Sequence, residues 1–197
     1  MNMERLAKNW YSTLAIAALM AAAPSRALAQ DQHSHAGPGQ ELLQNLRSKG
    51  GALVRTVREA TERFKDVNVA EAEGYHLQFG CVSGPDAGAM GMHFINGPLV
   101  GDGVIDASKP EIVIYEPQAD GSLKLIGADY LVLAAQWNAT HSSAPELMGQ
   151  QFHLFEAPNR FGLPAFYTLH VWAWTDSPTG TFVNWNTNVS CNAFSGQ

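Results

Sequence analysis

The chain has 197 residues, of which 46% are hydrophobic, and it carries a formal net charge of −6. A chain of this length usually folds into one domain with a substantial hydrophobic core. The acidic balance argues against nucleic acid or an anionic membrane as the partner, because both attract basic protein surfaces.

The first 29 residues predict an export signal. Arg5 and Lys8 precede a short apolar stretch, and residues 27–29 (ALA) form the small-x-small pattern at which such signals are cleaved. The apolar stretch is too short to span a bilayer, and no second long apolar run follows it. We therefore expect an exported protein, periplasmic or extracellular, without a membrane span.

After the signal, residues 30–40 are polar and contain glycine and proline, which predicts a flexible leader. Residues 41–197 predict a single α+β domain. Its first part is helical, with a break at Gly50-Gly51 and a short second helix that ends at Gly74. The apolar residues that fit one face of this helical region are Leu42, Leu46, Leu53, Val57, Ala60 and Phe64.

From Tyr75 onward the pattern changes to short apolar segments separated by turn residues, which is typical of antiparallel strands. Asp120-Gly121, between two such segments, indicates a hairpin. The predicted fold is therefore a set of N-terminal helices packed on an antiparallel β-sandwich or barrel-like domain.

Cys81 and Cys191 are the two cysteines of the chain. In an exported protein an even pair of this kind predicts a disulfide. Such a bond would close a loop of roughly 110 residues. By the chain-entropy argument, this stabilises the folded state by about 4–5 kcal/mol.

Three histidines lie singly inside strand-like apolar segments: His93 in residues 91–96, His153 in residues 151–156 and His170 in residues 167–172. A buried imidazole is unfavourable unless both of its nitrogen atoms find partners. We therefore expect the three to converge on one divalent transition metal, either Zn, Cu, Fe or Mn, with Glu116 as the preferred carboxylate ligand.

Several alternatives to this ligand set stay open. Each histidine can instead be a core residue bonded to a separate backbone group, and Glu111, Glu156 and His76 are further ligand candidates. The sequence carries no catalytic motif, so whether the protein is an enzyme, and with what substrate, stays open as well.

Two other functions compete with metal binding. The first is a non-enzymatic periplasmic module that binds a small ligand or a carbohydrate on aromatic side chains. The aromatic candidates for such a surface are Trp137, Trp172, Trp174, Trp185, Phe166 and Tyr167. The second is a hydrolase that uses a carboxylate pair such as Glu116 with Glu156.

Five motifs occur in a fixed order along the chain: residues 91–96 (GMHFIN), 115–117 (YEP), 149–153 (GQQFH), 169–174 (LHVWAW) and 185–191 (WNTNVSC). Together they resemble the pattern of a family of uncharacterised secreted bacterial proteins. The resemblance implies that the segments around His93, His153 and His170 belong to the family pattern, which fits a shared site and a shared core equally. It implies no activity, substrate or cofactor.

Overall fold

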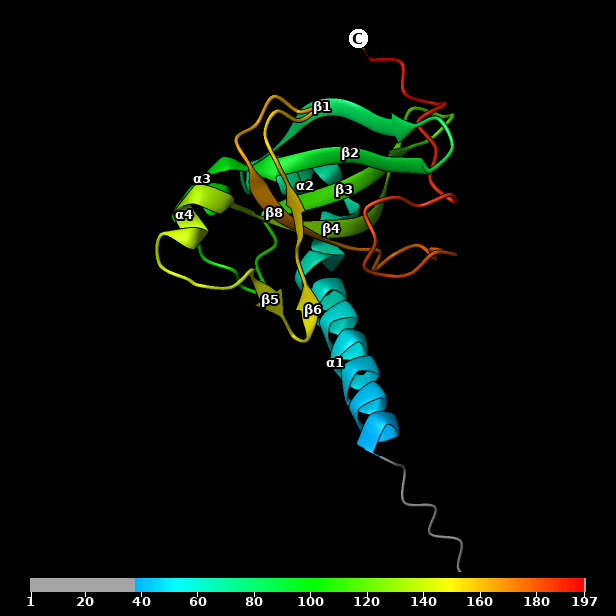
Figure 1. The fold of residues 1–197 in the computed structure, drawn as a ribbon. Helices are drawn as coiled ribbons and strands as arrows, with labels where there is room; N and C mark the ends of the chain where they lie inside the picture. The colour runs from blue at the N-terminus through cyan, green and yellow to red at the C-terminus, as the bar shows by residue number, and fades with distance from the viewer. Residues whose placement is uncertain (1–37, 197) are drawn as a thin grey trace, which may run out of the picture. The chain divides into compact units, whose positions relative to one another are not determined.

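The computed structural model describes residues 38–196 (Figure 1). The predicted export signal and residues 30–37 of the predicted leader lie outside the described residues. Residues 38–40, which we assigned to the leader, form the start of the first helix, α1 (Pro38–Thr61).

Helix α1 is continuous through Gly50-Gly51, so the predicted break is wrong. A glycine inside a helix is unfavourable by about 1 kcal/mol relative to alanine. Gly50 has a packing role that offsets this, because a Cβ atom there would lie 3.1 Å from the ring of Phe182. The glycine lets the segment around Phe182 pack directly against the helix backbone.

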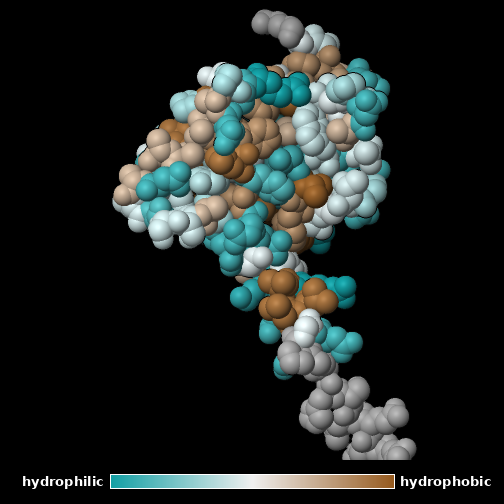
Figure 2. Space-filling view, in the orientation of Figure 1, coloured by the Kyte–Doolittle hydropathy of each residue, from teal (hydrophilic) through white to brown (hydrophobic). Residues whose placement is uncertain are grey.

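The predicted apolar face of α1 is correct, but only its C-terminal half packs against the sheet. Leu53 and Val57 are fully buried, whereas Leu42, Leu43 and Leu46 are exposed. The exposed half projects away from the sheet in Figure 1, and Figure 2 shows hydrophobic surface on this projecting part.

Two short helical segments, η1 (Glu62–Lys65) and α2 (Val67–Ala72), lead from α1 into the sheet. The Asp66 side chain caps α2 by accepting a hydrogen bond from the backbone N–H of Asn68. Gly74 then turns the chain with a positive φ of 94°, as expected from its place after the second helix.

A six-stranded antiparallel sheet forms the rest of the body, in the order β1-β2-β3-β4-β8-β7. It curls into a half-barrel (Figure 1). This confirms the predicted α+β class, with a helical layer on a curled antiparallel sheet. The strands are β1 (Tyr75–Gly84), β2 (Gly88–Asn96), β3 (Ile112–Pro117), β4 (Leu123–Leu133), β7 (His153–Phe155) and β8 (Phe166–Val171).

Short elements fill the connections between these strands. Helix α3 (Gly97–Asp102) follows β2, and helix α4 (Ala134–Asn138) follows β4. A separate two-stranded ribbon consists of β5 (Glu146–Leu147) and β6 (Gln150–Gln151). Among the described residues, no helix is long and apolar enough to cross a membrane.

The two faces of the sheet carry different residues, because successive side chains of a strand point to opposite faces. One face packs Tyr130 and Leu169 against Leu53 and Val57 of α1. The opposite face, which α1 does not cover, carries a second apolar cluster built around Ile112, Ile114, Leu131 and Phe166. The histidines of interest lie on this second face.

The predicted disulfide between Cys81 and Cys191 is confirmed. It joins β1 to the segment that follows β8, and it spans 110 residues of sequence. Next to the bond, Phe194 lies against Gly80, where a Cβ atom would be 3.1 Å from the ring. The C-terminal segment is thus held at one edge of the sheet.

Candidate metal centre

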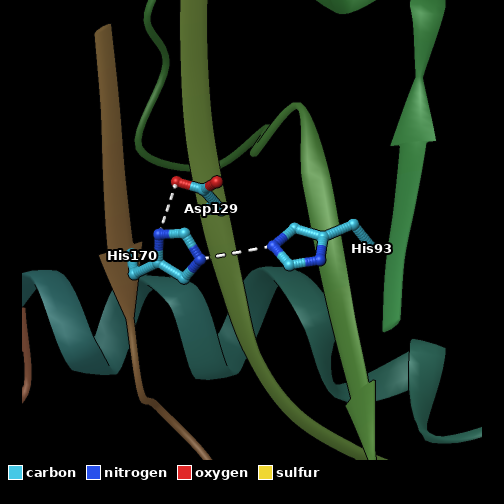
Figure 3. A group of neighbouring side chains, drawn as sticks. All are labelled: His93, Asp129 and His170. Atoms are coloured by element: carbon cyan, nitrogen blue, oxygen red, sulfur yellow. Dashed lines mark hydrogen bonds and ion pairs between the residues drawn. The ribbon is translucent and has the colours of Figure 1, made fainter. Parts of the chain in front are cut away.

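Three buried side chains from three different strands point toward one another: His93 of β2, Asp129 of β4 and His170 of β8 (Figure 3). The Nε2 atoms of His93 and His170 are 3.3 Å apart. On the other side of the His170 ring, Nδ1 lies 3.4 Å from Oδ1 of Asp129. One ligand atom from each residue lies within 4.8 Å of the other two, which is close enough for all three to share one ion.

The strand register explains how residues so far apart in sequence meet. Asp129 and His170 are direct cross-strand partners between β4 and β8, so their side chains share a face. His93 lies opposite Ile114 of β3, on the same face of the sheet. Because the sheet curls, His93 reaches His170 across the two intervening strands (Figure 1).

The three side chains border a cavity of about 30 Å³, which is large enough for one water-sized molecule. Thr168, also on its wall, donates a hydrogen bond of 2.5 Å from Oγ1 to Oδ1 of Asp129. The remaining wall is aliphatic or aromatic, formed by Phe79, Met90, Ile95, Ile112, Leu131, Phe155, Phe161, Leu163 and Phe166. No lysine or arginine is among these lining residues, so the described wall offers no cation to pair with Asp129.

Two ring nitrogens of the cluster are buried without a hydrogen-bond partner in the described structure, Nδ1 of His93 and Nδ1 of His170. The contact from His170 Nδ1 to Asp129 has the length of an ion pair but not the geometry of a hydrogen bond. Buried polar groups are nearly always satisfied, because leaving one unpaired is unfavourable by about 1–3 kcal/mol. Neither Nδ1 atom belongs to the pair of Nε2 atoms that face each other, so these two unpaired nitrogens are a cost of burying the rings.

The electrostatics of the cavity keep both imidazoles neutral. Burial lowers the pKa of His93, and the neighbouring His170 lowers it further, against weaker opposition from Asp129 and the Gly91 backbone. Burial also lowers the pKa of His170, with a contribution from the charge of His153. The neutral imidazole is the form that binds metals.

Burial has the opposite effect on the carboxyl group of the cluster. It raises the pKa of Asp129, while the neighbouring His93 ring and the hydrogen bond from Thr168 lower it. A divalent cation would reverse this balance by favouring the carboxylate, because the ion becomes the largest local charge.

The distances and donor types fit a transition metal. Two nitrogen ligands at about 2.0–2.1 Å from a tetrahedral ion lie about 3.3–3.4 Å apart, which is the separation of the two Nε2 atoms. Two imidazoles and one carboxylate form a ligand set used by zinc and by non-haem iron(II), with coordination positions left open for water or substrate.

The structure places the predicted ligand His153 differently from the other two histidines. His153 lies on β7, an edge strand, directly opposite Thr168, and its side chain is exposed. The expectation of burial therefore holds for His93 and His170 but is wrong for His153, because an edge strand is covered by a neighbour on one side only. His153 is not part of the converging cluster.

Glu116 also lies away from the cluster, at the end of β3. Its Oε1 accepts a hydrogen bond from the backbone N–H of Ser190, and its Oε2 is 3.9 Å from Nζ of Lys124. Its observed role is to fix the C-terminal segment against the sheet.

The other candidates are scattered. Glu111 is buried immediately before β3, where its Oε2 accepts a hydrogen bond from the N–H of Leu131, and Glu156 is exposed. His76 is exposed on β1. None of these three joins the converging cluster.

The aromatic residues do not gather on one open surface. Phe166, Tyr167 and Trp172 are buried, and Trp172 donates a hydrogen bond from its indole N–H to the backbone oxygen of Val183. Trp174 donates in the same way to the Thr61 hydroxyl, and Trp137 stacks on His141. Most of these residues serve packing, as their apolar bulk favours.

Asp129 is the member of the cluster that sequence reasoning missed. It directly precedes the apolar segment that begins at Tyr130, and it was not among the predicted ligands. Strand β4 in fact runs from Leu123 to Leu133, so Asp129 lies in the middle of a buried strand. The sequence feature that could have identified Asp129 was a single carboxylate residue with strand-forming residues on both sides.

Comparison with protein-family models, with curated proteins and with solved structures found no match to this chain. The resemblance to a family of secreted bacterial proteins therefore stays a prediction, and the site is interpreted from its own geometry.

Proposed function

We propose that the protein binds one divalent transition metal through Nε2 of His93, Nε2 of His170 and the carboxylate of Asp129. The observation that carries this proposal is the convergence of these three groups in a buried, apolar cavity. Two neutral imidazoles and one carboxylate would supply a single negative charge, which partly balances the two positive charges of the ion, and the ion in turn pairs the buried carboxylate without any lysine or arginine.

Each residue of the cavity has a distinct part in the proposed site. The histidines supply the two nitrogen ligands, and Asp129 supplies the oxygen ligand and the negative charge. Thr168 donates a hydrogen bond to this carboxylate and so orients it, as partners of metal ligands commonly do.

The proposed site is of the open kind. Three protein ligands leave at least one coordination position free, whereas closed structural zinc sites use four. A metal with an open position can activate bound water or polarise a substrate oxygen, and the cavity has room for a water-sized molecule beside the ligands. We propose a metalloenzyme that uses zinc or iron, and the Cys81–Cys191 disulfide supports its operation outside the cytosol.

The test is the metal content of untagged protein, measured by elemental mass spectrometry after expression with the export signal intact. We expect close to one zinc or iron ion per chain in the wild type. Replacing the exposed His76 by alanine should leave this content unchanged, which controls for the loss of a surface histidine.

His93→Ala and Asp129→Asn should each lose the ion. Circular dichroism checks that both variants fold, and Asp129→Asn keeps the size of the side chain if His93→Ala proves unstable. Protein that contains no metal, and takes up none when zinc, iron, copper or manganese is added, would contradict the proposal. That result would instead favour a metal-free binding module with structural histidines.

A further inference from the structure

A second hollow, of about 530 Å³, opens next to the metal cavity, and we call it the vestibule. Phe79, Ile95, Leu131 and Leu163 line both spaces and so form the partition between them. The volume lies in the range of 300–1,000 Å³ that is typical of sites for small organic molecules. The vestibule can therefore hold a small molecule directly beside the metal cavity.

The walls of the vestibule are uncharged. None of the described residues that line it is an aspartate, glutamate, lysine or arginine. The side chains other than the partition are mainly aliphatic, such as Val100 of α3 and Leu133 of β4, while His76 and Gln78 of β1 add two polar groups. Such a wall favours an uncharged, mainly apolar molecule, because an ion would lose hydration without gaining a partner.

Phe79 gives the partition an unusual feature. It lies in a bulge of β1, between Gln78 and Cys81, and adopts a positive φ of 65°. This conformation is unfavourable for a bulky side chain, and it persists where the surroundings hold it. The residue is nevertheless 46% exposed, and its ring centroid lies 5.5 Å from that of Phe161, at the boundary between the two spaces.

We propose that the vestibule binds a small, uncharged and mainly apolar organic molecule, the substrate of the neighbouring metal site. The identification of this molecule as the substrate rests on the proposed metal function. The binding itself depends only on the apolar walls. His76 and Gln78 would hydrogen-bond a single polar group of the ligand at the rim.

The binding is tested with two fluorescent probes of the same aromatic skeleton. N-phenyl-1-naphthylamine is uncharged, and 1-anilinonaphthalene-8-sulfonate carries a sulfonate. We expect saturable, one-site binding of the uncharged probe to metal-free protein, at least about tenfold tighter than binding of the sulfonate. Equal affinity for both probes, or no saturable binding of the uncharged one, would overturn the inference.

Variants locate the bound probe. Val100→Asp puts a charge into the vestibule and should weaken the binding of the uncharged probe at least about tenfold. Pro98→Asp, at an exposed position of the same wall, is the second variant if the half-buried Val100 does not tolerate the change. Val104→Asp, at an exposed position outside the vestibule, is the matched control and should not alter binding. Unchanged binding in a folded vestibule variant would place the probe elsewhere and contradict the inference.

Proximity to the metal is measured with indole as the ligand. Manganese(II) in the cavity should broaden the proton resonances of bound indole, whereas zinc should not. Equal line widths in protein that contains stoichiometric manganese would overturn the assignment of the ligand as substrate. Protein that binds metal but no probe refutes only the vestibule, and protein that binds the probe but no metal refutes only the proposed function.

Discussion

The Nε2 atoms of His93 and His170 lie 3.3 Å apart, although 77 residues of sequence and two strands of the sheet separate the two histidines. Two neutral rings at this distance can share one proton, or both can direct a lone pair at one ion. The carboxylate of Asp129 beside them and the apolar wall around them favour the ion. The predictions below separate this interpretation from that of a structural histidine pair.

The first prediction concerns the apolar replacement His93→Phe. If the histidines are there to bind metal, removing one buried imidazole should leave the metal-free protein at least as stable as the wild type. The wild type should gain about 2.7 kcal/mol of stability at a zinc concentration one hundred times Kd, seen as a rise in Tm of about 5–10 °C.

Thermal unfolding with a chelator and with added zinc measures both effects of His93→Phe, and the variant should show no zinc-dependent rise. Two results together would show that His93 has a structural role. The metal-free His93→Phe variant would be several kcal/mol less stable than the metal-free wild type, and zinc would not raise the Tm of the wild type.

The second prediction concerns the charge of Asp129. Asp129→Asn keeps the shape of the side chain but removes its negative charge, so metal affinity should fall at least about tenfold. Competition with a chromophoric chelator measures the affinity. Asp120→Asn, in the exposed hairpin turn between β3 and β4, is the matched control and should bind metal like the wild type. Equal affinity in both variants would remove Asp129 from the ligand set.

The third prediction concerns pH and the buried carboxyl of Glu111. Burial raises the pKa of Glu111 from 4.5 to about 8, against opposing hydrogen bonds from backbone N–H groups. Between these two values the folded protein binds more protons than the unfolded chain. The stability contributed by Glu111 is therefore full below pH 4.5 and is lost as the pH rises through about 8.

The clearest window for this test lies above pH 6.5. Below that value the histidines of the unfolded chain become protonated, while burial keeps His93 and His170 neutral in the folded protein. Their effect on the free energy of unfolding therefore changes with pH in the direction opposite to that of Glu111. From pH 6.5 to 8 the metal-free wild type should lose about 1.5–2 kcal/mol of unfolding free energy in urea titrations. Glu111→Gln, which keeps an acceptor for Leu131 N–H, should show a nearly flat profile, and a slope equal to that of the wild type would contradict the assignment.

The fourth prediction concerns the disulfide. Replacing both Cys81 and Cys191 by alanine should lower the unfolding free energy by about 4 kcal/mol, because the bond closes a loop of 110 residues in the unfolded chain. Urea denaturation of the variant, of the reduced wild type and of the oxidised wild type measures this. Equal midpoints for the oxidised and reduced wild type would show that the bond adds no stability.

Local patterns in the sequence were sufficient for the fold class and for part of the site. The spacing of Leu53 and Val57 predicted a helix face, and the short apolar segments after Tyr75 predicted antiparallel strands. Those patterns are local, so they do not determine how far a sheet curls or which strand lies at its edge. His153 was misjudged for this reason, since its segment is as apolar as those of His93 and His170 but forms an edge strand.

The ligand set depends on register, which sequence patterns do not contain. Asp129 and His170 meet because β4 and β8 pair with these two residues opposite each other, and His93 joins them only through the curl of the sheet. Glu116 occupies the same face as Ile112 and Ile114, but its carboxylate accepts a hydrogen bond from Ser190 near the end of β3 and is not part of the cluster.

The most direct test of the metal site is a crystal structure of the metal-loaded protein, with diffraction data collected above and below the absorption edge of the metal. We predict one strong anomalous peak per chain, about 2.0–2.2 Å from Nε2 of His93, Nε2 of His170 and a carboxylate oxygen of Asp129. An anomalous peak at other residues, or a cavity that holds only water at saturating metal, would contradict the proposed centre.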